Sequence, residues 1–517
     1  MEPPSKRVRL TEANDSSEPP AHLEELSSLH RPISPPPKRN REGQRIKSPF
    51  QLTRIRDLPD AANKDAVGLK DILCDPLIAE CWEFNFLHDV HFLMSHFDQD
   101  TKHLVKVHVV HGFWKREDPN RLALQEEAAA YENVELHGAF MPEMFGTHHS
   151  KMMILIRHDD SAQVVIHTAN MIAKDWTNMT NAVWLSPLLP LLPEKDLPTV
   201  DHAIGTGLRF KFDLLSYLRA YDVRRPTVRA LIDKLALHDF SAVRAALIAS
   251  VPGRHSINDV STTSWGWPAL KHALRNVPVQ QGKSEVVAQI SSIATLGATD
   301  SWLQKCLFDS LSASSTKPSS LKPAFKVIFP TADEIRRSLD GYASGGSIHT
   351  KIQSQQQAKQ LAYMRPLFCH WANDSPSGKP LPETAEIREA GRQRAAPHIK
   401  TYIRYGEKSI DWALVTSANI SKQAWGEAAG ASQEVRIASW EVGVLIWPSI
   451  IADEAMMLET FQQDTPPRDA AGGHRPVVRL RIPYNLPLQH YGQDEIPWVA
   501  SMVHVEPDRM GRVWGAE

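Results

Sequence analysis

Two segments of the sequence carry the same polar residues at the same spacing. In each, a histidine is followed by a lysine after two residues, an asparagine after 21 and a tryptophan after 27. The two copies are His149, Lys151, Asn170 and Trp176, and His398, Lys400, Asn419 and Trp425. Ammonium and amide groups suit phosphate oxygens, and an imidazole can attack phosphorus or move protons. Two imidazoles beside one phosphate predict phosphoryl transfer, in which one forms a phosphohistidine and the other protonates the leaving group and then activates water.

The residues around each motif predict the strands that would position it. One apolar run follows each lysine and a second ends at each asparagine, over 152–156 and 164–170, and over 401–404 and 413–419. Because residues i and i+2 of a strand share a face, each histidine emerges beside its lysine, while His148 points away. A single such pair is typical of exposed polar residues at a strand start. Two matched copies, 249 residues apart, instead predict duplicated halves that face one another.

Length and composition predict a soluble, intracellular protein of about two or three domains. The 517 residues exceed one hydrophobic core, and no apolar run reaches the roughly 18 residues that span a bilayer. The beginning of the chain lacks the apolar core of a signal peptide. Four scattered cysteines predict reduced thiols, and no cluster in the sequence has metal-ligand spacing. Since 58 Lys and Arg oppose 60 Asp and Glu, any contact with DNA must come from a local groove.

Composition also divides the chain into a tail and two halves. The first part is rich in proline, serine and charge, which predicts disorder. Its basic clusters at 6–9 and 37–41 are typical both of nuclear-import signals and of solvated charge. A strand is expected over 105–110, and a helical pattern over 201–237 breaks at Pro226. The expected parts are a disordered tail over 1–47, a first domain over 48–224 and a second domain over 225–517.

The paired motifs resemble the phospholipase D superfamily, and their surroundings resemble its tyrosyl-DNA phosphodiesterase family. The resemblance rests on residues 145–153, 165–170, 184–187, 397–402 and 416–422, and extends more weakly from about residue 48 onward. In the wider superfamily an aspartate follows the lysine by five residues, but Ile156 and Tyr405 stand here, as in the tyrosyl-DNA branch. That difference argues against a lipid-cleaving enzyme. The resemblance implies an α/β fold of two similar phospholipase D-like halves, each an α-β-α sandwich, which form one pseudo-two-fold active site.

The resemblance also implies a role for each motif residue. His149 of the first motif is the nucleophile, and His398 of the second is the general acid and base. The phosphate is bound by Lys151, Lys400, Asn170 and Asn419. Glu441 matches a carboxylate that orients the nucleophile. The matching amide of the first half is usually glutamine, and Asn181 stands there instead, one methylene shorter, so a water bridge or a small shift would keep its contact.

Contacts with DNA are implied for a further group of residues. Phe145 resembles an aromatic residue that stacks on a base near the cleaved end, with core packing as the alternative. Phe86 stands where the family often has tyrosine and leaves an apolar wall. Backbone phosphates are held in the family by segments that match Ser291, Ser292, Ser347, Ser421 and Lys422. Trp176 and Trp425 are expected in the core.

The implied function is DNA repair by a phosphodiesterase that needs no metal and no cofactor. It would hydrolyse the bond between a DNA 3′ phosphate and the tyrosine of a stalled type IB topoisomerase. The expected substrate is single-stranded or end-frayed DNA with a 3′-tyrosyl or topoisomerase I-derived peptide adduct, and the expected enzyme is a nuclear monomer without a membrane partner. Two alternatives stay open: a broader 3′-end-processing phosphodiesterase or nuclease of the same superfamily, and a catalytically degenerate DNA-end-binding module. The intact motifs disfavour the second alternative.

Overall fold

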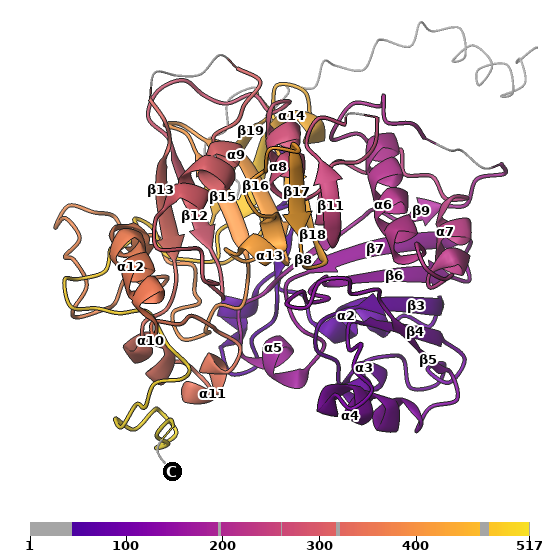
Figure 1. The fold of residues 1–517 in the computed structure, drawn as a ribbon, viewed down its shortest axis with the longest axis horizontal. Coiled ribbons are helices and arrows are strands. Elements are labelled where there is room, and N and C mark those ends of the chain that lie inside the picture. Colours follow the sequence, from indigo (N-terminus) through magenta and orange to yellow (C-terminus); the bar gives the residue numbers. More distant parts are fainter. Residues whose placement is uncertain (1–43, 195–197, 260, 317–320, 466–474, 516–517) are drawn as a thin grey trace, which may run out of the picture. The chain divides into compact units, whose positions relative to one another are not determined.

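Two mixed β-sheets form the framework of the described residues. The computed structural model describes residues 44–194, 198–259, 261–316, 321–465 and 475–515. One sheet has eight strands and the other ten, and a separate two-stranded sheet joins β11 (Gly253–Ser256) to β17 (Glu434–Ile437). In Figure 1 the eight-stranded sheet is drawn in indigo to magenta, and most of the ten-stranded sheet in red to orange.

The eight-stranded sheet contains the first histidine motif. Its order is β2-β8-β7-β6-β3-β4-β5, with β9 paired to β7. Its strands are β2 (Gln51–Leu52), β3 (Ile78–Phe84), β4 (Lys106–His111), β5 (Val134–Gly138), β6 (Met152–Arg157), β7 (Ser161–His167), β8 (Ala182–Leu185) and β9 (Leu189–Pro190). The helices of this half are η1 (Asp60–Asn63), α2 (Leu69–Leu73), α3 (Val90–Ser95), α4 (Pro119–Ala128), α5 (Ala173–Thr177), α6 (Gly207–Tyr221) and α7 (Arg229–Leu235).

The ten-stranded sheet contains the second motif. Its order is β1-β20-β19-β16-β15-β12-β13-β14, and β18 pairs with both β16 and β10. Its strands are β1 (Arg45–Ile46), β10 (Ala246–Ser250), β12 (Glu285–Gln289), β13 (Ala324–Ile328), β14 (Phe368–Cys369), β15 (Thr401–Tyr405), β16 (Ile410–Thr416), β18 (Glu441–Ile446), β19 (Met456–Thr460) and β20 (Val477–Arg481). The helices of this half are α8 (Gly266–Leu274), η2 (Leu303–Phe308), α9 (Asp309–Leu311), α10 (Ala332–Arg336), α11 (Tyr342–Gly345), α12 (Gln355–Met364), η3 (Arg365–Leu367), α13 (Lys422–Trp425) and α14 (Pro448–Ile451).

Strand β6 shows why an unbroken apolar run forms a strand here. Successive side chains of a strand point to opposite faces, and both faces of this sheet are covered. Met152 and Ile154 lie in the core that also contains residues of α6 and α7, whereas Met153 and Leu155 lie in the core with residues of α3 and α4. Packing against both cores holds β6 in place and thereby positions the His-x-Lys segment that directly precedes it.

Several expectations from the sequence are confirmed. The strand expected over 105–110 is β4, and the helical pattern over 201–237 is α6 and α7 with Pro226 between them. Trp176 and Trp425 are buried in the hydrophobic cores. None of the helices in the described ranges combines the length and apolar character of a bilayer-spanning segment.

The predicted extent of the tail is wrong at its end. Residues 1–43 of the predicted tail 1–47 lie outside the described residues, but β1 lies within it and pairs in parallel with β20. Residues 45 and 46 pair with a strand that lies more than 400 residues away in the sequence. Local composition, from which disorder was predicted, cannot reveal such pairing. The second sheet therefore begins before the first in the chain. A border between the two domains near residue 225 stays a prediction.

Trp440 joins the two halves. It directly precedes β18 and is 1% exposed. Its indole stacks on Tyr221 of α6, with ring centroids 3.8 Å apart, and its Nε1 donates to the carbonyl oxygen of Phe140 at 3.1 Å. The side chain thus packs against residues of the other half, Tyr221 on α6 and Phe140 after β5.

Replacing Trp440 with alanine should therefore lower the free energy of unfolding by about 3–5 kcal/mol, the usual cost of truncating a buried tryptophan. The measurement is chemical denaturation of the purified protein. Trp114→Ala is the matched control, because Trp114 is 55% exposed and its loss should change the free energy by no more than about 0.5 kcal/mol. Equal effects of the two substitutions would contradict the role given to Trp440.

Candidate active site

The two histidine motifs meet at one cavity. His149 and Lys151 precede β6, and His398 and Lys400 precede β15. The cavity has a volume of about 400 Å³, and its lining includes both histidines, both motif asparagines and Glu441. The two lysines and Asn181 are fully buried and lie behind this lining, where they contact the motif histidines or their carbonyl oxygens. The structure thus brings all eight predicted catalytic residues into one site.

Short backbone bridges between the halves hold the two motifs in place. In one, the amide of His149 donates to the carbonyl oxygen of Trp440 at 3.0 Å, and the Trp440 amide donates to Thr147 at 2.9 Å. In the other, the amide of His398 donates to the carbonyl oxygen of Thr180 at 3.0 Å, and the Thr180 amide donates to Ala396 at 3.0 Å. Each motif is therefore paired with the residue just before an orienting residue of the other half, Glu441 or Asn181.

Gly146 allows the first bridge to form. A Cβ atom at this position would lie 1.9 Å from the carbonyl oxygen of Ala438. Such an approach is closed to any residue with a side chain, so only glycine lets the two backbones pass this closely.

Glu441 holds the ring of His149. The Nδ1 atom of His149 lies 2.9 Å from Oε2 of Glu441, which also accepts a hydrogen bond from the hydroxyl of Ser417 at 2.5 Å. A carboxylate accepts hydrogen bonds only, so Nδ1 of His149 carries the proton. The unprotonated Nε2 of the ring is then available to the cavity. His148 points away, as predicted, and its ring contacts the carbonyl oxygen of Asn85 and the hydroxyl of Tyr221.

His398 is held by two groups rather than one. Its Nδ1 atom lies 3.3 Å from Oδ1 of Asn181 and 3.2 Å from Oδ2 of Asp175. Asn181 thus reaches the ring directly, without the water bridge or shift considered from the sequence. Asp175, fully buried in α5, was missed by the sequence analysis. The equivalent position of the second motif is Ala424, so the repeat itself gave no signal for it.

The lysines and Asn419 are held by hydrogen bonds to neighbouring residues of the site. Lys151 Nζ donates to the carbonyl oxygen of His149 at 3.1 Å, and Lys400 Nζ lies 3.1 Å from Nε2 of His398. The Oδ1 atom of Asn419 accepts hydrogen bonds from the amides of Ser291 and Ser292 at 3.0 and 2.9 Å. Because its carbonyl oxygen is engaged, Asn419 has its NH₂ group left to donate to an anion.

Burial and like charge shift the protonation of the site. Burial lowers the pKa of His149 to about 4, against the opposing effect of Glu441. Burial, followed by the charges of Lys400 and Lys151, holds the pKa of His398 well below its ordinary value. Burial lowers the pKa of Lys151 to about 8, and burial with the charge of Lys151 holds the pKa of Lys400 well below its usual range. These shifts favour neutral imidazoles at pH 7 and reduce the charge of the two lysines.

Most of the predicted DNA-binding residues line the same cavity. These are Phe86, Phe145, Ser291, Ser292, Ser347 and Ser421. Phe145 is 79% exposed, so core packing, the alternative considered for it, is wrong. Lys422 does not line the cavity. Lys174 and His349 do, and neither was singled out from the sequence, because their segments carry no repeated pattern.

Internal hydrogen bonds reduce what the predicted serines can offer a phosphate. The amides of Ser291 and Ser292 donate to Oδ1 of Asn419, so they are engaged within the protein, and that these residues bind DNA stays a prediction. The hydroxyl of Ser347 donates to Oδ1 of Asp175 at 3.1 Å. The hydroxyl of Ser421 accepts from the Ala424 amide at 3.0 Å and keeps its own hydrogen for a ligand.

The sequence is similar to those of known phosphodiesterases. The family model described as tyrosyl-DNA phosphodiesterase matches residues 49–492. A Schizosaccharomyces pombe protein named probable tyrosyl-DNA phosphodiesterase is 30% identical over 91% of this chain and 96% of that protein. A Drosophila melanogaster protein named tyrosyl-DNA phosphodiesterase 1 is 32% identical over 87% of this chain and 73% of that protein.

The fold is also similar to a solved structure. The yeast tyrosyl-DNA phosphodiesterase structure superposes with a TM-score of 0.61 and 20% identity, over 87% of this chain and 98% of that one. This similarity confirms the expected α/β fold. The matched length and the identity to the curated relatives establish that the chain belongs to the tyrosyl-DNA phosphodiesterase family.

Proposed function

We propose that this chain hydrolyses the bond between a DNA 3′ phosphate and a tyrosine through a phosphohistidine intermediate. The observation that carries the proposal is the pair of imidazoles at one cavity, each held at Nδ1 by groups from the other half. Two lysines behind them supply the positive charge that a phosphate needs. The names of the family and of its curated members support tyrosyl-DNA as the substrate class.

His149 is the proposed nucleophile. Its Nδ1 proton faces Glu441, and the low pKa of its ring, about 4, keeps Nε2 unprotonated at neutral pH. Nε2 attacks the phosphorus, the bond from phosphorus to the tyrosine oxygen breaks, and the tyrosine leaves as a phenol with a proton from His398. Water then attacks the phosphorus, the bond from phosphorus to Nε2 breaks, and DNA with a 3′ phosphate is released.

His398 is the proposed proton carrier. It gives a proton to the leaving tyrosine oxygen and takes one from the attacking water. Burial, followed by the charges of Lys400 and Lys151, holds the pKa of His398 well below its ordinary value and so favours the neutral ring. The negative charge of a bound phosphodiester offsets those charges, so we infer that substrate binding draws a proton onto Nε2 of His398. Asp175 and Asn181 hold the ring in position through Nδ1.

The substrate is proposed to be single-stranded or end-frayed DNA with a 3′-tyrosyl or topoisomerase I-derived peptide adduct. Phe145 stands exposed at the cavity and offers a ring on which a base can stack, worth about 1–3 kcal/mol per base without reading sequence. Phe86 lies 5.7 Å from the His149 ring, between centroids, and forms an apolar wall. We propose that the enzyme acts as a monomer, because both motifs of the site are in one chain.

A nuclear location is proposed from the basic clusters of the tail, which lie outside the described residues. Removing residues 1–43 tests it without cutting β1. A tagged chain without these residues should lose nuclear accumulation while the purified enzyme keeps its activity. Unchanged localisation would overturn the proposal for the tail alone.

The first test of the function compares two oligonucleotides in the presence of EDTA. The purified chain should release tyrosine from a 3′-phosphotyrosyl oligonucleotide and leave an unmodified one intact, because the imidazoles and ammoniums carry the proposed chemistry. Equal degradation of both would favour a nuclease, and binding without turnover would favour an end-binding module. Loss of turnover in EDTA that Mg²⁺ restores would contradict the metal-independent mechanism.

The second prediction separates the two histidines. A phenol with a pKa near ~10 is a tolerable leaving group without full protonation, whereas water needs a base. His398→Asn should therefore slow the second step more than the first, so that a covalent protein–DNA adduct accumulates on gels run under non-acidic conditions. His149→Ala, alone or combined with His398→Asn, should form no adduct. Asp175→Asn should resemble His398→Asn in a weaker form, because it acts through the same ring.

Single-turnover kinetics with tyrosine and with a better phenolic leaving group provide the control. If His398→Asn slowed the first step equally for both and no adduct appeared, the roles of the two histidines would have to be exchanged.

The third prediction concerns pH. A lysine binds phosphate in its protonated form, and that form is lost as the pH rises through the pKa, which for Lys151 in the free enzyme is about 8. Since kcat/KM reports groups of the free enzyme, it should fall above about pH 8, while kcat, measured with phosphate bound, should persist to higher pH. Lys151→Met should be slower throughout and lack the fall near pH 8 that belongs to Lys151. A flat kcat/KM profile of the wild-type enzyme between pH 7 and roughly pH 10 would contradict the proposal that protonated Lys151 binds the phosphate.

A further inference from the structure

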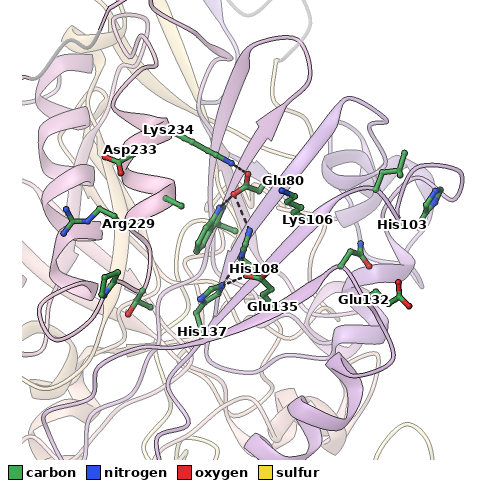
Figure 2. Close-up of a pocket in the computed structure, with 16 residues that line it drawn as sticks. Glu80, His103, Lys106, His108, Glu132, Glu135, His137, Arg229, Asp233 and Lys234 are labelled. Atoms are coloured by element: carbon green, nitrogen blue, oxygen red, sulfur yellow. Dashed lines mark hydrogen bonds and ion pairs between the residues drawn. The ribbon is translucent and has the colours of Figure 1, made fainter.

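A second cavity lies in the first half, apart from the active site. It has a volume of about 960 Å³ and is bordered by residues of β3, β4, β5 and α7. None of the residues that line it lines the active-site cavity. Figure 2 shows a cluster of histidine and glutamate side chains that gather on the strand side of this cavity.

Three of these side chains bring their ligand atoms together. His108 lies on β4, and Glu135 and His137 lie on β5, which pairs with β4 in parallel so that His108 is opposite Glu135. Nδ1 of His108 lies 3.0 Å from Nε2 of His137 and 3.3 Å from Oε2 of Glu135, and the last two atoms are 3.7 Å apart. Within the described residues, this is the group of three whose ligand atoms converge closely enough to hold a metal ion.

The size of this triangle matches the coordination shell of a zinc ion. With zinc-to-ligand distances of about 2.0–2.1 Å in a tetrahedron, neighbouring ligand atoms are roughly 3.3–3.4 Å apart. The three measured separations lie on both sides of that value. Two imidazoles and one carboxylate also form a ligand set that zinc accepts, whereas magnesium and calcium prefer oxygen ligands alone.

Neighbouring residues hold the histidines in the orientation that a metal needs. The ring of His108 stacks on Trp82 with centroids 3.9 Å apart and planes at 14°, and the ring of His137 stacks on the same indole at 5.2 Å. Nε2 of His108 lies 3.4 Å from Oε1 of Glu80, which also accepts from Trp82 Nε1 at 2.6 Å. A proton on Nε2 facing Glu80 leaves Nδ1 unprotonated for a metal, the carboxylate–histidine arrangement common behind zinc ligands.

The cavity leaves room for an ion to enter and for a fourth ligand. The side chain of Glu135 is 68% exposed, whereas those of His108 and His137 are 12% and 21% exposed. Glu80 is ion-paired to Lys234 of α7, which keeps it in place behind His108. Lining carboxylates (Glu80, Glu132, Glu135, Asp233) outnumber lining lysines and arginines (Lys106, Arg229, Lys234), so the cavity does not repel a cation by its charge.

We propose that His108, Glu135 and His137 bind one zinc ion, with the fourth coordination position open to the cavity. The site is independent of the phosphodiesterase chemistry proposed above, because it shares no lining residue with that cavity. No metal site is evident in the sequence, because His108 and Glu135 are 27 residues apart and only their pairing across neighbouring strands brings them together.

The test is calorimetric titration of the metal-free full chain with ZnCl₂. One zinc ion per chain should bind with a dissociation constant below about 1 μM. His108→Gln and Glu135→Gln should each weaken binding at least tenfold. Glu80→Gln should weaken it about 10- to 100-fold, the usual effect of losing a group behind a metal ligand. His103→Gln is the matched control, since His103 lines the same cavity but lies outside the cluster and should leave binding unchanged.

Cobalt provides a readout of geometry. Co²⁺ bound to the wild-type chain should give the visible absorption of a four-coordinate ion, and His137→Gln should lose it. Glu135→Gln guards against misfolding as the cause, because this exposed side chain can change without disturbing the core. Wild-type protein that binds no zinc at about 10 μM free metal, or variants that keep the wild-type stoichiometry and affinity, would overturn the proposal. Either result leaves the EDTA assay of phosphodiesterase activity unaffected.

Discussion

The reciprocal backbone bridges between the halves are the constraint on which the active site depends. Each histidine motif is hydrogen-bonded to the residue that precedes an orienting group of the opposite half, through Trp440 for Glu441 and through Thr180 for Asn181. The 2.9 Å contact between His149 and Glu441 therefore depends on tertiary assembly and on no local element. Neither half alone supplies a motif histidine together with the side chain that holds its ring, so the site is formed only where the two halves pack together.

Burial gives this site its electrostatic character. Two lysines and two histidines share a small enclosed space, and burial lowers their combined charge by holding the pKa values of all four groups down. A phosphodiester reverses this balance, because its negative charge favours the protonated lysines and a protonated His398. For His149, the proposed nucleophile, burial favours the neutral ring, which is the form that can attack phosphorus. In the proposed mechanism, the charge of the substrate thus determines the protonation of the two lysines and of His398.

Local patterns predicted the parts of the site that lie on regular elements. The spacing of the motifs placed each histidine beside its lysine and turned His148 away, because strand alternation is a local property. Asp175 could not be found this way, since its contact with His398 crosses between the halves and has no counterpart in the second motif. Composition likewise assigned residues 45–46 to the tail, although β20 pairs with them from the far end of the chain. Segments defined by tertiary pairing leave no signal in a window of neighbouring residues.

The pseudo-two-fold arrangement also has a consequence for how the two histidines can diverge. In a symmetric pair of identical subunits, every residue of one appears in the other, so both imidazoles would have the same partner and the same basicity. Joining both copies in one chain removes that restriction. Here a carboxylate faces one ring, and an amide with a carboxylate from a short helix faces the other. Because both copies belong to one chain, their sequences can differ, and each imidazole can have a different partner. These partners can give the two rings different basicities, one suited to attack and the other to proton transfer.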